Sequence, residues 1–360
     1  MKIAMIPWDG NIRQDSIYQN KQSEDIDWHI QFAKAFAKAG HEFHTIDVFD
    51  DISKVDWFLF FTLDFSWMDR VIKCGKEKRM IYLNGEPPVV KPENSLEGYR
   101  KLLNVFAFIM TWNDDLVDGK RIFKRCIPYL FKKRYGTENF KERKLLVNIS
   151  GNKHSPHPKE LYSERERVIT WFEENTEDEF DLYGTGWNHR EHPSYRGIAG
   201  EKSDVYHHYR FALCLENTYQ MRGYLTEKLF DCFVSGIVPI YLGASDIDEY
   251  VPKSCYIDYS AFSTIGELYR FLADMTETEY QSYLSEIDAL LDTNIQDKFT
   301  GTLLAEQIMA ILDPAKIPPA LSVSGHDRRK IALLARRQEY QRLIMKEKKF
   351  IKQLLRISDR

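Results

Sequence analysis

Residues 211–243 read FALCLENTYQMRGYLTEKLFDCFVSGIVPIYLG, and this stretch decides the fold. An apolar run at 211–215 is followed by a polar loop. The segment from Thr226 to Gly236 has the spacing of an amphipathic helix, with a capping threonine before it and a glycine at its end. A second apolar run covers 237–242. The order strand, loop, helix, strand predicts a unit of an open parallel α/β sheet.

The loop and the start of the predicted helix carry groups that suit a diphosphate. In an open α/β sheet, ligands lie at the carboxyl ends of strands, beside the amino ends of the following helices. Thr226 and the free amides of the first helical turn form a seat for an anion. Lys228 and Arg222 add positive charge, and Glu227 can accept hydrogen bonds from sugar hydroxyls. A diphosphate attached to a ribose would satisfy all of these groups.

The same stretch resembles the signature of the α-1,3/4-fucosyltransferases, glycosyltransferase family 10. The matching residues are Phe211, Leu213, Glu216, Asn217, Tyr224, Thr226, Glu227, Lys228, Pro239, Ile240, Tyr241 and Gly243. The resemblance is strong from Leu145 to Leu272 and absent from the carboxy-terminal tail. It implies a GT-B fold, in which two Rossmann-like domains face a central cleft, and GDP-fucose as the donor substrate. Guanine and fucose rest on this resemblance alone.

Strands alternate with helices along the rest of the chain, which indicates a doubly wound parallel sheet in each half. Apolar runs predict further strands at 1–7, 43–49, 55–61, 80–83, 105–112, 145–149 and 180–183. A charged segment, 132–144, separates the two halves. With the resemblance, we predict an acceptor-binding Rossmann-like domain over residues 1–135 and a nucleotide-sugar-binding one over 144–313.

The composition is that of a globular protein with an acidic body. The chain has 360 residues, 43% of them hydrophobic, and a formal net charge of −4. Residues 327–360 hold twelve Lys and Arg against four Asp and Glu, so the rest of the chain is more acidic than the total. This acidity argues against nucleic-acid binding. The chain begins with a strand pattern and has no long apolar run, which predicts a cytoplasmic protein, similar to the soluble bacterial members of the family.

Glu86 is the residue predicted to act as the catalytic base. It follows a predicted strand and a glycine, and Pro87 and Pro88 stiffen the backbone behind it. Members of the family carry their proposed base in a similar G-E-x-x-P context, and this chain departs slightly by placing a proline directly after the glutamate. Transfer with inversion needs such a base to deprotonate the acceptor hydroxyl. Glu93 is the competing carboxylate, and a solvated turn glutamate is the alternative interpretation of Glu86.

Cations and polar groups of the second domain are predicted to hold the donor. The family places a phosphate-contacting arginine at the start of the helix after the first strand of this domain, a position that Arg165 fits. Arg167 is the alternative, because residues two apart point ~200° apart around a helix and cannot both face one ligand. A surface salt-bridge face is the other interpretation of this cluster. Asn217 and Tyr224 are expected to bind the diphosphate or the sugar, and Glu216 to approach the sugar or brace the loop.

No essential metal is predicted, with a divalent ion at most stimulating the reaction. Transferases of the GT-A type use a D-x-D motif to hold Mn²⁺ against the diphosphate. The two D-x-D segments of this chain, 25–27 and 246–248, do not close a strand in the expected way. Lys and Arg side chains would therefore neutralise the leaving group.

Residues 327–360 predict a basic amphipathic helix without proline or glycine. Leu333, Tyr340 and Ile344 recur near heptad spacing between basic residues. Such a helix lies on an anionic membrane or pairs with a partner helix. Bacterial members of the family can end in such a tail, which favours a peripheral position on the inner membrane face. A helix that docks on its own protein is the alternative.

The sequence thus predicts an inverting fucosyltransferase that uses GDP-fucose and an oligosaccharide acceptor. The expected acceptor group is a hydroxyl, O3 by preference, of an N-acetylglucosamine or glucose unit in a surface glycan. Two alternatives stay open at this point. One is the same scaffold with another nucleotide sugar, and the other is a glycan- or nucleotide-binding module that does not turn over.

Overall fold

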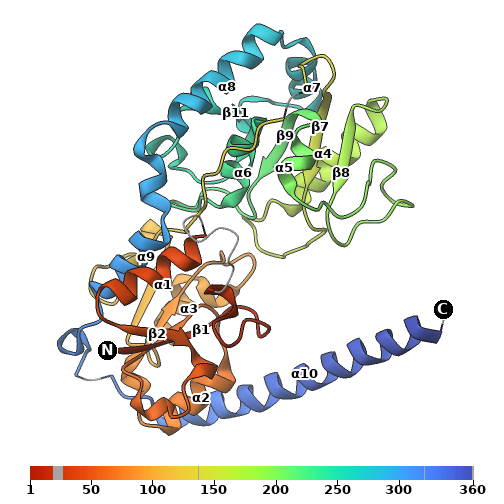
Figure 1. Ribbon diagram of the computed structural model, residues 1–360. Coiled ribbons are helices and arrows are strands. Elements are labelled where there is room, and N and C mark those ends of the chain that lie inside the picture. Colours follow the sequence, from red (N-terminus) through yellow and green to blue (C-terminus); the bar gives the residue numbers. More distant parts are fainter. Residues whose placement is uncertain (19–26, 137, 320, 359–360) are drawn as a thin grey trace.

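Two parallel β-sheets, one in each half of the chain, form the centres of two α/β domains (Figure 1). The structure is a computed structural model and describes residues 1–18, 27–136, 138–319 and 321–358. The predicted α/β class is confirmed, because every strand pair within both sheets is parallel over these residues.

The first sheet has the strand order β2-β1-β3-β4-β5-β6. Its strands are β1 (Lys2–Ile6), β2 (Glu42–Thr45), β3 (Trp57–Phe60), β4 (Met80–Leu83), β5 (Phe108–Thr111) and β6 (Ile122–Lys124). Every residue of β3, β4 and β5 is buried, because helices cover both faces of the sheet. This burial is why their sequences read as continuous apolar runs instead of alternating patterns.

The second sheet has the order β11-β10-β9-β7-β8. Its strands are β7 (Lys144–Ile149), β8 (Phe180–Tyr183), β9 (Tyr209–Leu215), β10 (Val238–Leu242) and β11 (Ile257–Asp258). The predicted strand, loop, helix, strand unit is present as β9, α6 (Glu227–Ser235) and β10. Thr226 caps α6, and Gly236 ends it in the left-handed conformation, with φ of 67°.

Helices surround both sheets. The first domain has α1 (Trp28–Lys38), α2 (Phe65–Lys73) and α3 (Leu96–Leu102), and the second has α4 (Tyr162–Asn175), α5 (Lys202–Tyr206), α7 (Ile265–Asp274) and α8 (Glu277–Leu291). Two further helices follow, α9 (Gly301–Met309) and α10 (Gly325–Ser358). No helix in the described part of the chain is long and apolar enough to cross a membrane.

The chain returns to the first domain after α8. Leu304 and Ile308 of α9 are fully buried in the core that also contains Phe32 and Phe36 of α1. The second domain predicted over 144–313 therefore ends earlier in the structure, and α9 belongs to the first domain by packing. The apolar periodicity of α9 predicts a helix, but it does not specify which sheet the helix covers.

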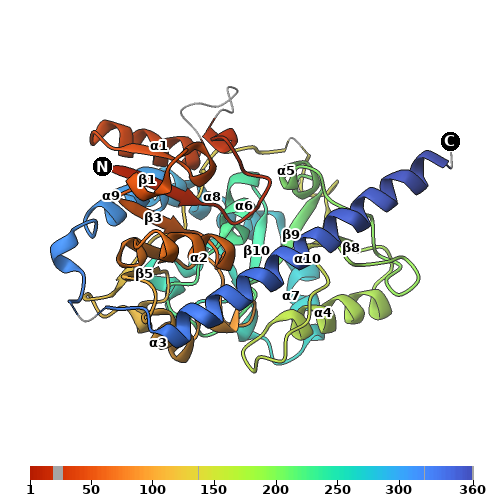
Figure 2. The same ribbon diagram turned by 90° about the horizontal axis from the view of Figure 1, so that it is seen from below.

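The first part of α10 docks on α2. Ile331 and Ala335 are buried, Arg342 forms an ion pair with Asp64 at 2.7 Å, and the side-chain oxygen of Gln338 accepts a hydrogen bond from the backbone of α2 at 2.9 Å. The rest of α10 projects away from the first domain (Figures 1 and 2). A basic helix was predicted over 327–360, of which residues 359 and 360 lie outside the described residues. Only the first part of α10 therefore matches the alternative of a helix that docks on its own protein.

Candidate active site

Most of the predicted site residues line one pocket between the two domains, with a volume of about 310 Å³. Gly85, Glu86 and Ile127 line it from the first domain. The loops after β7 and β9 and the start of α6 line it from the second domain. The order of the second sheet reverses between β7 and β9, which is where doubly wound sheets bind their ligands. The pocket therefore lies where this fold favours a nucleotide.

Lys228 and Glu216 form a buried ion pair beside the pocket. The Nζ atom of Lys228 lies 2.9 Å from Oε2 of Glu216, and Glu216 also accepts from the backbone and hydroxyl of Thr226, at 3.0 and 2.8 Å. Burial acts to lower the pKa of Lys228, but the charges of Glu216 and Glu227 outweigh it, so the pKa is raised and Lys228 stays cationic. Lys228 and Thr226 line the pocket, whereas Glu216 is fully buried behind them and braces the loop.

Arg165 reaches the pocket from the first turn of α4. It is buried, and its Nη2 group donates to the carbonyl oxygens of Leu215 at 2.7 Å and Glu216 at 3.2 Å. These bonds fix the guanidinium at the carboxyl end of β9. Burial lowers the pKa of Arg165, but an arginine remains charged at neutral pH. Nε and Nη1 have no hydrogen-bond partner among the described residues, and they remain available to a ligand.

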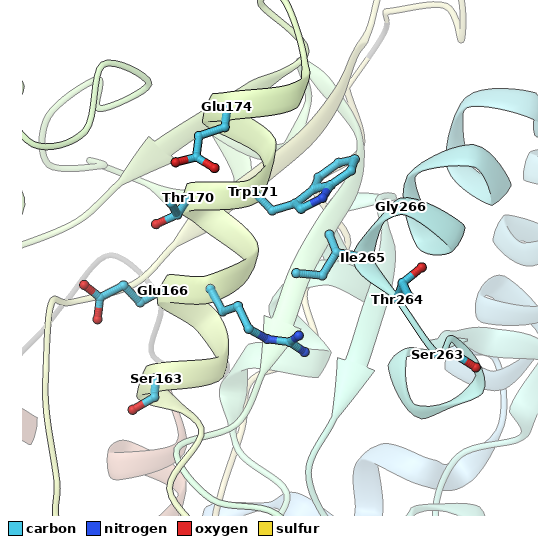
Figure 3. Close-up of a pocket in the computed structure, with 10 residues that line it drawn as sticks. Ser163, Glu166, Thr170, Trp171, Glu174, Ser263, Thr264, Ile265 and Gly266 are labelled. Atoms are coloured by element: carbon cyan, nitrogen blue, oxygen red, sulfur yellow. The ribbon is translucent and has the colours of Figure 1, made fainter.

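Arg167 faces a different part of the surface. Figure 3 shows a second hollow, of about 580 Å³, between α4 and residues 263–266. Arg167 lines this hollow and is paired with Glu164, with Nε 2.9 Å from Oε2. Trp171 and Glu174 of α4 also line this hollow, and Trp171 points toward Ile265 (Figure 3). The two arginines thus lie on different faces of α4, as their spacing predicted, and only Arg165 lines the pocket between the domains.

Asn217, Tyr224 and Glu227 all line the pocket. The side-chain amide of Asn217 donates to the hydroxyl of Tyr224 at 3.3 Å. Tyr224 packs against Trp112 of the first domain, with ring centroids 4.5 Å apart, so it also belongs to the domain interface. Burial acts to raise the pKa of Glu227, but Lys228 and Lys202 outweigh it, so the pKa is lowered and the carboxylate stays ionised.

Glu86 of the first domain lines the pocket that the cations Arg165 and Lys228 also line. Its loop is fixed because the buried amide of Asn94 donates to the backbone carbonyl of Glu86 at 2.6 Å. The raised pKa values of Tyr162 and Tyr224 in the second domain have burial as their main cause, and the charge of Glu86 adds to both. The competing carboxylate, Glu93, is exposed and does not line the pocket.

Arg222 does not reach the pocket. Its side chain is exposed and pairs with Glu249 at 3.2 Å and Asp246 at 3.5 Å. Its carbonyl accepts from the backbone of Asp114 in the first domain at 3.4 Å. The polar loop that carries Arg222 therefore contributes to the domain interface, although the sequence predicted a donor ligand here.

Two lysines that the sequence analysis did not select also line the pocket. Lys153 lies in the loop after β7, and Lys202 begins α5 and pairs with Asp231 at 2.6 Å. Lys153 could have been found, because a cation just after the first strand of the domain lies at the strand-order reversal. Lys202 carries no comparable signal. Within the described ranges, no three His, Cys, Asp or Glu side chains gather as a metal site, and residues 25 and 26 of the first D-x-D segment lie outside those ranges.

Comparisons with known proteins support one family. The family model "Glycosyltransferase family 10 (fucosyltransferase) C-term" matches residues 142–293. An alpha-(1,4)-fucosyltransferase of Arabidopsis thaliana is 49% identical over 61 residues, which are 17% of this chain and 15% of that protein. The human alpha-(1,3)-fucosyltransferase 7 is 35% identical over 97 residues, or 25% and 28% of the two chains. The alignments thus span less than a third of these relatives.

Solved structures share the fold over most of the chain. A crystal structure of an alpha1,3-fucosyltransferase has a TM-score of 0.55 at 14% identity and covers 87% of this chain and 90% of that one. An Anabaena protein in complex with UDP-glucose has a TM-score of 0.51 at 9% identity, covering 87% and 99%. These similarities confirm the predicted GT-B arrangement of two Rossmann-like domains. Residues 142–293, within the carboxy-terminal part of the chain, thus match the model of glycosyltransferase family 10, the fucosyltransferases.

Proposed function

We propose that this protein transfers fucose from GDP-fucose to a hydroxyl of a glycan, with O3 of an N-acetylglucosamine or glucose unit as the expected acceptor. The observation that carries the proposal is the pocket that Glu86 of one domain lines together with Lys228 and Arg165 of the other. Family membership of residues 142–293 supports the reaction class. A structure of similar fold, an alpha1,3-fucosyltransferase with a TM-score of 0.54 at 14% identity, was solved with GDP.

In this proposal each side of the pocket has one chemical task. Glu86 accepts the proton of the acceptor hydroxyl as its oxygen attacks the sugar. Lys228, Arg165 and the amides at the start of α6 stabilise the negative charge that develops on the departing diphosphate. A direct displacement, in which the acceptor oxygen bonds to the anomeric carbon on the face opposite the departing diphosphate, inverts the anomeric configuration. Asn217, Tyr224 and Glu227 orient the donor through its sugars or its phosphates.

The base is tested by comparing Glu86→Gln with Glu93→Gln. Glu93 is a matched control because it lies on the same connection, is exposed and stays outside the pocket. Removal of a general base costs about 10²- to 10⁴-fold in rate. Glu86→Gln should lose transfer to that extent and bind GDP within a few-fold of the unaltered protein, while Glu93→Gln should retain transfer. Retained transfer by Glu86→Gln would remove this residue from the role.

Donor identity is tested separately from turnover. The alternative of another nucleotide sugar is favoured by the UDP-glucose complex of a protein with the same fold. In a thermal-shift assay with a panel of GDP- and UDP-sugars, GDP-fucose should raise the melting temperature of the protein most. Transfer to an acceptor, or hydrolysis of the donor, then distinguishes an enzyme from a binding module without turnover.

We also propose that α10 binds an anionic membrane surface through its exposed apolar side chains and its basic carboxy-terminal end. Four apolar side chains of this helix are 60% exposed or more: Leu333, Tyr340, Leu343 and Met345. The sequence from 346 to 360 holds six Lys and Arg against two Asp and Glu. Exposed apolar groups beside positive charge are typical of helices that lie at the interface of anionic lipids.

A further inference from the structure

The strand order of the first sheet reverses at one position, equivalent to the one at which the pocket between the domains lies in the second sheet. The order β2-β1-β3-β4-β5-β6 reverses between β1 and β3, so the fold favours a ligand at the carboxyl ends of these two strands. Trp8 follows β1 and Phe61 follows β3 at this point. Nothing in the proposed donor site uses either residue.

An aromatic cluster fills this position. Trp8 stacks on His29, with centroids 5.4 Å apart, and on Trp28 at 6.2 Å, and it meets Phe61 at 5.9 Å. Although three rings lie against it, Trp8 keeps 45% of its surface exposed. A large aromatic side chain held by neighbouring rings and left open to solvent is typical of a binding surface.

The groups around this aromatic platform, defined as Trp8, Trp28, His29 and Phe61, do not suit an anion. The guanidinium of Arg125 is buried, lies 5.8 Å from the ring of Phe61 and donates to a backbone carbonyl. Lys91 donates to the hydroxyl of Thr62 at 3.1 Å. Burial lowers the pKa of His29, against the opposing effect of Asp27, so the imidazole is neutral at pH 7. Among the residues that the structure describes, the platform therefore offers ring faces, while the cations of Arg125 and Lys91 are engaged by other groups.

The platform lies at the same edge of the sheet as Glu86. In the parallel register, Ile6 of β1 pairs with Phe60 of β3, and Phe60 pairs with Tyr82 of β4. Trp8 and Glu86 both extend beyond this row of residues. The strands β1 and β4 are separated by β3 alone, which places their ends about 10 Å apart. A short oligosaccharide can span that distance.

We infer that this aromatic platform binds the acceptor saccharide, at a sugar unit next to the one that reacts at Glu86. The C–H face of a pyranose ring is weakly apolar and packs on aromatic faces, so the platform suits a neutral glycan better than a phosphate. The inference rests on the proposed function and adds the part of the acceptor that is recognised. It predicts that the protein distinguishes acceptors by length, and that Trp8 is a positioning residue and not a catalytic one.

The test compares Trp8→Ala and Trp8→Phe with Phe271→Ala. Phe271, on α7 of the second domain, is a matched control because it is an aromatic side chain with 41% of its surface exposed. For Trp8→Ala, KM for an acceptor of three sugar units should rise at least tenfold, with a smaller rise for the single reactive sugar and with GDP affinity unchanged. Trp8→Phe should recover part of this loss, and Phe271→Ala should have the KM of the unaltered protein.

The decisive quantity is the ratio of KM for the three-unit acceptor to KM for the single sugar. If this ratio is the same in Trp8→Ala as in the unaltered protein, the inference is overturned. If the unaltered protein transfers nothing, the proposed function fails, and binding of the GDP-loaded protein to a glycan array tests the platform by itself. The array should then show neutral glycans bound by the unaltered protein and lost in Trp8→Ala. If neither protein binds to the array, or if both bind alike, the inference is also overturned.

Discussion

Lys228 lines the pocket, and its ammonium group also neutralises the buried Glu216. Lys228→Ala should weaken GDP binding by about 1.5–3 kcal/mol, the contribution of a charged hydrogen bond. It should also lower the free energy of unfolding, since an unpaired carboxylate is left buried. The double variant Lys228→Ala/Glu216→Gln removes this second effect. Calorimetric titration should therefore show the same loss of GDP affinity in the single and the double variant. If the double variant binds GDP as tightly as the unaltered protein, Lys228 does not have this role.

Glu227 gives the stability of the fold a predictable dependence on pH. Burial acts to raise its pKa, but Lys228 and Lys202 lower it below the ordinary value of 4.5. A lowered pKa means that the carboxylate stabilises the fold above its unfolded pKa and loses this effect as the pH falls through the folded one. The difference in melting temperature between Glu227→Gln and the unaltered protein should thus be largest above about pH 5 and shrink below about pH 4. A difference that is constant over this range would count against the lowered pKa.

At the scale of elements, the packing of α9 on α1 joins the carboxy-terminal segment to the first domain. A Cβ atom at Gly301 would lie 1.9 Å from the backbone oxygen of Trp28. Gly301→Ala should therefore force the helices apart and reduce the free energy of unfolding by about 1–3 kcal/mol or more, measured by denaturant titration. Gly325→Ala is the control, since this glycine also begins a helix but has no atom within 4 Å of the added Cβ. Equal stability of the two variants would exclude the close approach.

The same elements explain what the sequence can predict. The unit from β9 to β10 was predicted because caps, periodicity and apolar runs are local signals, and Lys228, Tyr224 and Asn217 followed from their place in it. The return of α9 to the first domain depends on contacts between residues about 270 positions apart, such as Gly301 and Gln31, which periodicity does not encode. The directions of Arg222 and Glu216 are set by tertiary ion pairs. The sequence therefore predicted a donor ligand at Arg222, which lies outside the pocket, and left open whether Glu216 approaches the sugar or braces the loop.

For the whole molecule, α10 separates into a docked part and a projecting part, and truncation can test them individually. Removal of residues 346–360 should abolish binding to vesicles that contain anionic lipid, because it removes six of the twelve Lys and Arg of residues 327–360, and should leave the melting temperature unchanged. Removal from residue 325 onward should lower the melting temperature as well, because Ile331 and Ala335 are buried against the first domain. Vesicle co-sedimentation that survives the shorter truncation would contradict the membrane proposal.

The central claim is that a nucleotide sugar lies between the domains, with its diphosphate on the second and its reactive carbon towards the first. The most direct test is a crystal structure of the Glu86→Gln variant with GDP-fucose, in which slow turnover preserves the donor. The diphosphate should lie within hydrogen-bonding distance of Lys228 and Arg165, with residue 86 facing the sugar. A donor bound in the hollow beside Trp171, or a residue 86 directed away from the sugar, would contradict the account.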